Sequence, residues 1–214
     1  MLLWSKRYLA GLSCLLVSLC LIGCGENERL PALPAGSVVL ALGDSLTAGA
    51  GVTPEQAWPH LLEASTGWQV INGGVNGNTS NDALQRLPDL LEEHQPVLVI
   101  LTLGGNDMLR RLPEQETEEN LAKMIVKCKA AGAQVVLQAT PEPSLAGAVL
   151  RNLSAPEFYR QIAQAHQVPL IEDAVAEVLS DPLLKGDQIH PNAEGHTRLA
   201  GKIFEALRDI GYVD

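Results

Sequence analysis

The feature of this sequence that most constrains its fold is a regular alternation of short apolar runs with longer segments of helical periodicity. The apolar runs lie at residues 37–42, 68–72, 97–103, 134–139 and 168–171. Most of them are continuously apolar, which is typical of strands covered on both faces. Helical patterns lie near residues 54–65, 79–93, 115–131, 155–167, 173–180 and 192–211. Five repeats of this alternation predict a parallel sheet with helices on both faces.

The predicted fold class is therefore α/β, a three-layer α/β/α sandwich around a five-stranded parallel sheet. Right-handed crossovers leave few strand arrangements, and we expect the order 2-1-3-4-5. In such sheets ligands bind outside the carboxyl ends of the strands, at the point where the winding reverses. In this order the reversal lies between the first and third strands, so we expect the functional crevice there.

The N-terminal residues have the pattern of a leader. Residues 8–23 contain no charged side chain; they follow Lys6 and Arg7 and are followed directly by Cys24. The run is shorter than the roughly 20 residues that a membrane-spanning helix needs, which favours a signal peptide. Its last letters, "LIGC", resemble the lipobox of bacterial lipoproteins, in which the cysteine is lipidated after cleavage. An ordinary secretory signal and an uncleaved anchor are the alternatives.

This pattern divides the chain into a lipoprotein signal peptide (1–23), a lipidated cysteine with a tether (24–36) and one domain (37–214). With 214 residues in all, the chain can bury a sizeable core. The formal net charge of −10 argues against nucleic acid as the main partner. Cys128 has helical spacing with apolar neighbours, so we interpret it as a small buried residue. Nothing in the sequence requires more than a monomer.

Polar or glycine-rich loops follow four of the predicted elements. "GDSLT" follows the first strand and contains Ser45, and "GGVNGNTS" follows the second and contains Gly77. "GGNDMLR" follows the third strand and contains Asn106, while "DQIHPN" supplies Asp187 and His190 after the fifth strand and its helix. The predicted fold gathers these loops on one rim of the sheet.

These residue types together can perform nucleophilic catalysis. A serine needs a base to take its proton, and His190 has suitable chemistry, with Asp187 to fix its tautomer. The oxyanion of a tetrahedral intermediate needs donors, for which the candidates are the Ser45 N–H, the Gly77 N–H and the Asn106 amide. The simpler interpretation of Ser45 alone is a helix N-cap.

Two other kinds of site fit the sequence poorly. "GDSLTAGAGV" lacks the third glycine of a dinucleotide loop, since Pro54 stands at that position. Asp187, His190 and His196 form a weak metal ligand set, and we interpret His196 as a structural helix residue. Asp44 and Asp107, which neighbour Ser45 and Asn106, are expected to cap helices and bond loops.

The four loops "GDSLT", "GGVNGNTS", "GGNDMLR" and "DQIHPN" follow one another along the chain in the same order as four motifs of the SGNH, or GDSL, hydrolase family, which they resemble. The resemblance is greatest to the bacterial arylesterase, thioesterase I and lysophospholipase branch of that family. The resemblance covers residues 37–212 and implies a flavodoxin-like fold, no metal or organic cofactor, and a small-molecule acyl ester or thioester substrate. It assigns Ser45, Asp187 and His190 to catalysis and Ser45, Gly77 and Asn106 to the oxyanion hole. Residues 141–156 do not resemble the corresponding loop of that branch.

The main hypothesis is thus a serine esterase of the bacterial cell envelope, facing the periplasm and anchored by lipid at Cys24. The protein would be secreted or periplasmic if the lipobox is not used. One alternative is a carbohydrate or peptidoglycan O-acetylesterase with the same catalytic residues. Another, of a different class, is a lipoprotein that binds acyl ligands without catalysis.

Overall fold

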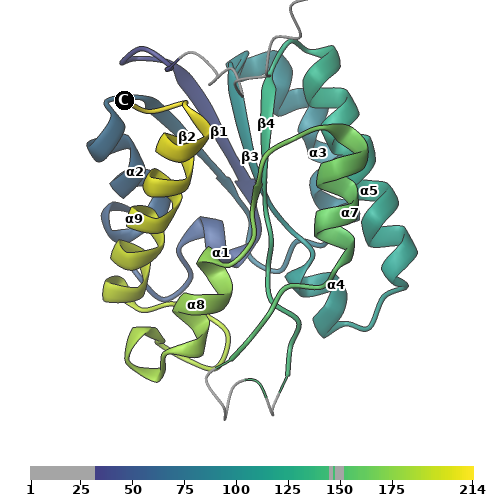
Figure 1. The fold of residues 1–214 in the computed structure, drawn as a ribbon, viewed down its shortest axis with the longest axis vertical. Coiled ribbons are helices and arrows are strands. Elements are labelled where there is room, and N and C mark those ends of the chain that lie inside the picture. The colour runs from purple at the N-terminus through teal and green to yellow at the C-terminus, as the bar shows by residue number, and fades with distance from the viewer. Residues whose placement is uncertain (1–31, 145–146, 148–151) are drawn as a thin grey trace, which may run out of the picture.

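The computed structural model describes residues 32–144, 147 and 152–214, which form a parallel sheet with helices on both faces (Figure 1). The five strands are β1 (Val38–Gly43), β2 (Gln69–Gly74), β3 (Leu98–Thr102), β4 (Gln134–Gln138) and β5 (Leu170–Ile171). Their order is β2-β1-β3-β4-β5, and every pairing is parallel. The predicted fold class and strand order are confirmed.

Each face of the sheet carries its own apolar core. Helices α3 (Ser80–His94), α5 (Glu114–Ala130) and α7 (Phe158–His166) cover one face, and α2 (Trp58–Thr66), α8 (Ala174–Ser180) and α9 (Ala193–Ile210) cover the other. In β3 every side chain is buried: Val99 and Leu101 pack on the first side, Leu98 and Ile100 on the second. This two-sided burial explains why the strands are continuously apolar. Cys128 is fully buried on α5, as predicted.

The helix boundaries differ from the predicted ones where turns interrupt the periodicity. The predicted helix at 54–65 is a 3₁₀ turn, η1 (Pro54–Gln56), followed by α2, because Ala57 between them has extended backbone. The helix predicted at 155–167 begins at Phe158. Three further elements, α1 (Ser45–Ala48), α4 (Gly105–Leu109) and η2 (Pro182–Leu184), are too short to produce a periodic pattern.

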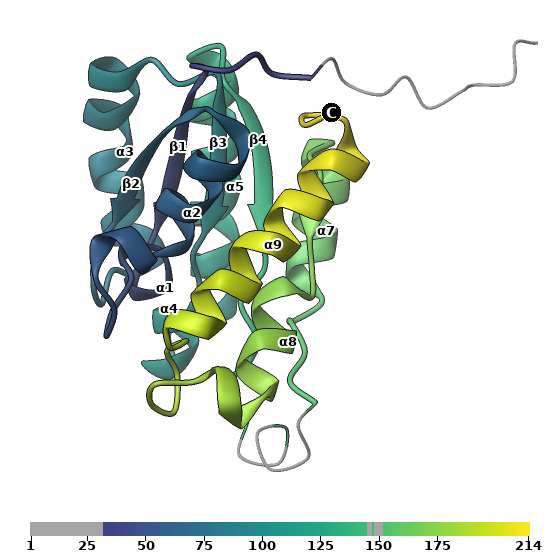
Figure 2. The same ribbon diagram turned by 90° about the vertical axis from the view of Figure 1, so that its left-hand side faces the viewer.

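The segment that precedes β1 contacts the domain at one end of the sheet. The Leu33 N–H donates to the Tyr212 carbonyl oxygen, and its own carbonyl accepts from the Trp68 indole, so contacts with the domain begin before the predicted boundary at 37. This chain entry lies at the end of the sheet opposite α1, α4 and α8 (Figure 2). The predicted signal peptide and the lipidation site Cys24 lie outside the described residues. Within the described part, no helix has both the length and the apolar character to span a bilayer.

Candidate active site

Ser45 begins α1, immediately after β1 has ended at Gly43. The turn between strand and helix is tight: a Cβ on Gly43 would lie 2.0 Å from Thr47 Oγ1. Asp44 caps the helix, because its Oδ1 accepts the Leu46 N–H at 2.9 Å. Gly49 ends the helix with a φ of 84°, a conformation that favours glycine. The short helix therefore presents Ser45 at the carboxyl end of the sheet, as predicted.

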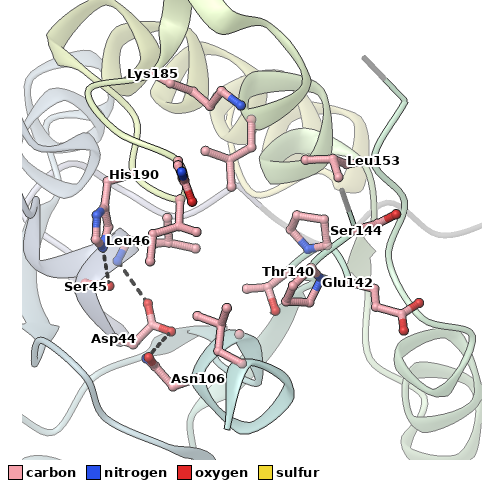
Figure 3. Close-up of a pocket in the computed structure, with 17 residues that line it drawn as sticks. Asp44, Ser45, Leu46, Asn106, Thr140, Glu142, Ser144, Leu153, Lys185 and His190 are labelled. Carbon is pink, nitrogen blue, oxygen red and sulfur yellow. Dashed lines mark hydrogen bonds between the residues drawn. The ribbon is translucent and has the colours of Figure 1, made fainter. Parts of the chain in front are cut away.

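Ser45 opens into a pocket of about 460 Å³ (Figure 3). Its walls come from the short helices α1 and α4, from α8, from the segment between β4 and α7, and from the loop before α9. These walls are mainly apolar and include Leu46, Leu109, Pro141, Pro143, Leu153, Leu179 and Ile189. The pocket is large enough for the acyl part of an ester, and apolar side chains favour such a group over water.

The loop that carries Asp187 and His190 is closed by its own hydrogen bonds. Lys185 and Pro191 form an antiparallel bridge, and the Gly186 N–H donates to the His190 carbonyl at 3.0 Å. Asn192 then caps α9 by accepting the Gly195 N–H at 2.9 Å. The start of the last helix thus fixes the loop.

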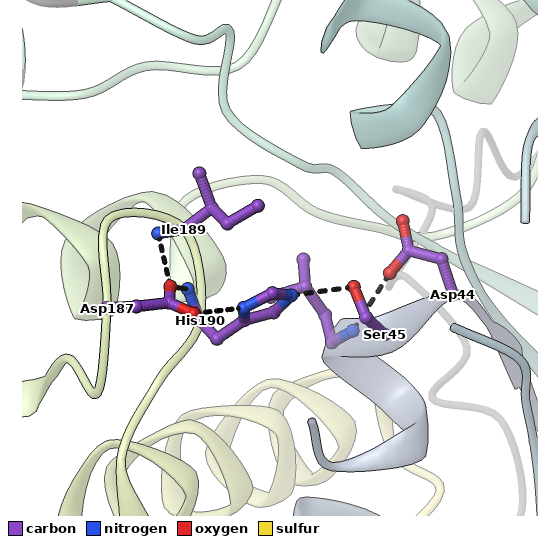
Figure 4. Close-up of polar contacts among 6 residues, drawn as sticks. Asp44, Ser45, Asp187, Ile189 and His190 are labelled. Carbon is purple, nitrogen blue, oxygen red and sulfur yellow. Dashed lines mark hydrogen bonds and ion pairs between the residues drawn. The ribbon is translucent and has the colours of Figure 1, made fainter. Parts of the chain in front are cut away.

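The structure brings together the three predicted catalytic residues, Ser45, His190 and Asp187 (Figure 4). The distance from His190 Nε2 to Ser45 Oγ is 3.0 Å, and that from His190 Nδ1 to Asp187 Oδ2 is 2.7 Å. When the carboxylate accepts the Nδ1 proton, Nε2 keeps a lone pair and can accept the serine proton. The arrangement has the geometry of an activated nucleophile.

Asp187 is held as a carboxylate by the same loop. Its Oδ1 accepts the N–H groups of Ile189 and His190, each at 2.8 Å. Burial acts to raise the pKa of Asp187, but the hydrogen bonds from the His190 ring and from these two N–H groups outweigh it and hold the pKa below the usual value. Asp187 therefore stays ionised where it bonds His190.

The three predicted oxyanion donors differ in their present partners. The N–H groups of Ser45 and Gly77 have no acceptor in the described part of the chain, and Gly77 has a φ of 78°. Asn106 Nδ2 instead donates to Asp44 Oδ2 at 3.1 Å and to the Asn78 carbonyl at 3.0 Å. Two backbone donors are thus free, and the amide of Asn106 lies next to the residue that precedes Ser45.

Asp44 has a larger role than the cap that its sequence position indicated. It is 2% exposed and bonds both the start of α1 and Asn106, so it joins the loops after β1 and β3. Burial raises the pKa of Asp44 from 3.8 to about 6, although the Leu46 N–H acts to lower it. Position alone could not reveal this burial, because the covering loops come from distant parts of the chain.

We expect Asp44 to make folding stability depend on pH. Its pKa is raised in the folded state, so the folded state binds the proton more tightly and stability falls as pH rises from about 4 to 6. Relative to wild type, Asp44→Asn should therefore gain roughly 2–3 kcal/mol in free energy of unfolding between pH 4 and pH 7.5. Urea denaturation of both proteins at the two pH values measures this change, and an unchanged difference would contradict it.

The effect of Asp44 must be measured as a difference between wild type and Asp44→Asn, because a second buried group, His196, changes the folding stability with pH in the opposite direction. This side chain is fully buried on α9, and its Nδ1 accepts the Trp58 N–H at 3.3 Å. Burial, followed by the charge of His190, lowers the pKa of His196 from 6.5 to about 4, so its contribution to stability is lost as pH falls from 6.5 towards 4. His196 thus has the structural role that the sequence indicated. Among the described residues, no group of three or more His, Cys, Asp or Glu side chains is placed to hold a metal ion.

Tyr159 supports the turn between β3 and α4, the helix that carries Asn106, and sequence reasoning did not find it. The Tyr159 hydroxyl donates to the Leu103 carbonyl at 2.6 Å and lies 2.7 Å from Thr140 Oγ1. A Cβ on Gly104 would lie 2.3 Å from this hydroxyl, so glycine lets the tyrosine reach the loop. Along the sequence, Tyr159 has the spacing of an ordinary core residue of a helix.

A parallel α/β sheet that carries a serine, a histidine and an aspartate in this geometry defines a serine hydrolase. The chain belongs to the GDSL-like lipase/acylhydrolase family, whose model matches residues 41–198. The predicted family and the prediction of a GDSL-type serine esterase are therefore confirmed.

Individual relatives agree with this family. The chain is 36% identical over 181 residues to the thioesterase 1/protease 1/lysophospholipase L1 of Escherichia coli, covering 82% of this chain and 86% of that protein. It is 35% identical over 179 residues to the arylesterase of Vibrio mimicus, covering 81% and 89%. Among solved structures, the psychrotrophic esterase EstA from Pseudoalteromonas sp. is similar with a TM-score of 0.71 at 26% identity, covering 81% of this chain and 97% of that one.

Proposed function

We propose that this esterase hydrolyses acyl esters and thioesters through an acyl-enzyme formed on Ser45. The observation that carries the proposal is the continuous hydrogen-bonded series Ser45–His190–Asp187. His190 Nε2 removes the proton as Ser45 Oγ attacks the carbonyl carbon. It then protonates the leaving alcohol or thiol as the tetrahedral intermediate collapses. Water attacks the acyl-enzyme with the same assistance, and the acid leaves.

The oxyanion of each intermediate is assigned to the Ser45 N–H, the Gly77 N–H and the Asn106 amide. The two backbone N–H groups are free to donate, which supports their role. Asn106 Nδ2 must exchange one of its present acceptors, Asp44 Oδ2 or the Asn78 carbonyl, for the oxyanion. The two backbone N–H groups need no such exchange, and fixed donors of this kind stabilise the developing charge without reorganisation of solvent.

Asn106→Ala is expected to lower kcat by a factor on the order of 10²–10³, since one oxyanion donor is removed. Steady-state hydrolysis of p-nitrophenyl butyrate measures this change. Asn81→Ala, which alters an exposed asparagine at the start of α3, is the matched control and should retain full activity. A kcat for Asn106→Ala equal to that of wild type would remove Asn106 from the oxyanion hole.

The substrate class proposed is acyl and aryl esters, acyl thioesters and lysophospholipids. The apolar walls of the pocket support an acyl chain, and the names of the relatives include arylesterase, thioesterase and lysophospholipase. Hydrolysis of p-nitrophenyl esters from acetate to palmitate tests the class, with Ser45→Ala in parallel. Ser45-dependent activity that extends beyond acetate supports it. Activity on acetate alone would favour an O-acetylesterase, and no activity from a folded protein would favour a binding lipoprotein.

For localisation, we propose attachment to a membrane of the cell envelope through a lipid on Cys24, with the domain facing the periplasm. The "LIGC" motif and the entry of the chain at the end of the sheet opposite Ser45 support the proposal. Metabolic labelling with an alkyne fatty acid is expected to label the wild-type chain and not Cys24→Ser. Equal labelling of the two would exclude Cys24 as the lipidation site.

A further inference from the structure

Among the described residues that line the mainly apolar pocket of Ser45, one is a lysine, Lys185. Lys185 lines the pocket and is partly buried. Within the described part of the chain, its ammonium group makes no ion pair. In Figure 3 the Lys185 side chain lies on one side of the pocket, and the Glu142 carboxylate on the other side points away from it. The ammonium group is therefore available to a ligand.

The backbone of Lys185 is fixed relative to the catalytic histidine. It pairs with Pro191 at the base of the loop that carries His190, and Asn192 Nδ2 donates to its carbonyl at 3.3 Å. In the proposed function His190 delivers a proton to the departing alcohol or thiol, so the leaving group lies beside this loop. Lys185 belongs to the same loop and lines the same pocket, which places its charge on the side of the leaving group.

A positive charge at this position favours one kind of substrate. The chain carries a formal net charge of −10, so its overall field disfavours anions. Beside apolar walls an ammonium–anion attraction is stronger than in bulk water. We infer that Lys185 selects esters whose leaving group carries an anion, either a phosphate or a carboxylate. This inference deepens the proposed function and rests on it.

The experiment compares matched esters hydrolysed by the full chain. The neutral reference is p-nitrophenyl butyrate, and the test ester is 3-butyryloxy-4-nitrobenzoate, whose leaving nitrophenol carries a carboxylate. Mono-p-nitrophenyl adipate carries its carboxylate on the acyl side instead. The readout is kcat/KM for each anionic ester divided by that for the neutral ester, which cancels general effects of a substitution on the catalytic residues.

Lys185→Gln should lower this ratio for the nitrobenzoate ester about three- to tenfold, and Lys185→Glu should lower it further. In wild type the ratio for the nitrobenzoate ester should fall at high salt, because salt screens the attraction between Lys185 and the carboxylate. Lys202→Gln is the matched control: Lys202 is a partly buried lysine on α9 that pairs with Glu177 and does not line the pocket, so the ratio should stay unchanged.

Phosphate leaving groups are tested with two further pairs. One compares a lysophosphatidylglycerol with a monoacylglycerol, and the other compares an acyl-CoA with the acyl thioester of N-acetylcysteamine. If Lys185→Gln lowers the anionic-to-neutral ratio of kcat/KM in the first pair, the anion is the phosphate of a phospholipid. If it lowers the ratio in the second pair, the anion is the phosphate of a coenzyme thioester. The same ratios in Lys185→Gln and wild type for every pair, or an effect on the adipate ester alone, would overturn the inference. Lack of Ser45-dependent hydrolysis of the neutral ester would instead overturn the proposed function, and the inference with it.

Discussion

Ser45→Ala is expected to lower kcat for p-nitrophenyl butyrate on the order of 10⁴-fold or more, because the proposed acyl-enzyme forms on the Ser45 hydroxyl. The fold should be retained, since the Ser45 hydroxyl contacts His190 and carries no helix cap. Circular dichroism spectra and thermal unfolding should therefore match those of wild type. Ser65→Ala, which alters an exposed serine that bonds Leu61 within α2, is the control and should leave kcat unchanged. Substantial turnover by folded Ser45→Ala would show that another residue is the nucleophile.

His190→Ala is expected to have the second-largest effect, a loss on the order of 10³- to 10⁴-fold in kcat. Without the ring nothing accepts the proton of Ser45 Oγ, and nothing protonates the leaving group. The truncation leaves space between Ser45 and Asp187, so added imidazole should restore part of the activity in proportion to its concentration. A purely structural role would not give this rescue.

The control for His190 is His60→Ala, which alters an exposed histidine of α2 and should retain activity without imidazole. If His190→Ala kept wild-type kcat, the distance of 3.0 Å between His190 Nε2 and Ser45 Oγ would have no catalytic meaning. If activity were lost without any rescue, unfolding measurements would separate collapse of the 185–191 loop from loss of the base.

The strand order and the meeting of Ser45 with His190 could be predicted because they depend on rules that act along the sequence. Continuous apolar runs indicate strands that are covered on both faces, and parallel strands end on one edge of the sheet. Ser45 directly follows one strand end. His190 follows the last strand through a short helix and a loop. Their 3.0 Å contact is a consequence of this topology together with the hydrogen bonds that close the loop.

Other parts of the site depend on contacts that no local pattern encodes. The raised pKa of Asp44 requires burial by loops after β1 and β3, and Asp44 therefore looked like a simple cap. The support of the turn before α4 by Tyr159 joins Leu103, which follows β3, to a residue of α7. Lys185 has no periodicity or motif that marks it, because its position depends on the bridge to Pro191.

The central claim is that Ser45 is the activated nucleophile of this chain. The most direct measurement is intact-protein and peptide mass spectrometry after treatment with a fluorophosphonate. We expect one adduct per chain, located on Ser45, formed in parallel with loss of esterase activity and absent from both Ser45→Ala and heat-unfolded protein. Full esterase activity without an adduct, or an adduct on a different residue, would contradict the claim.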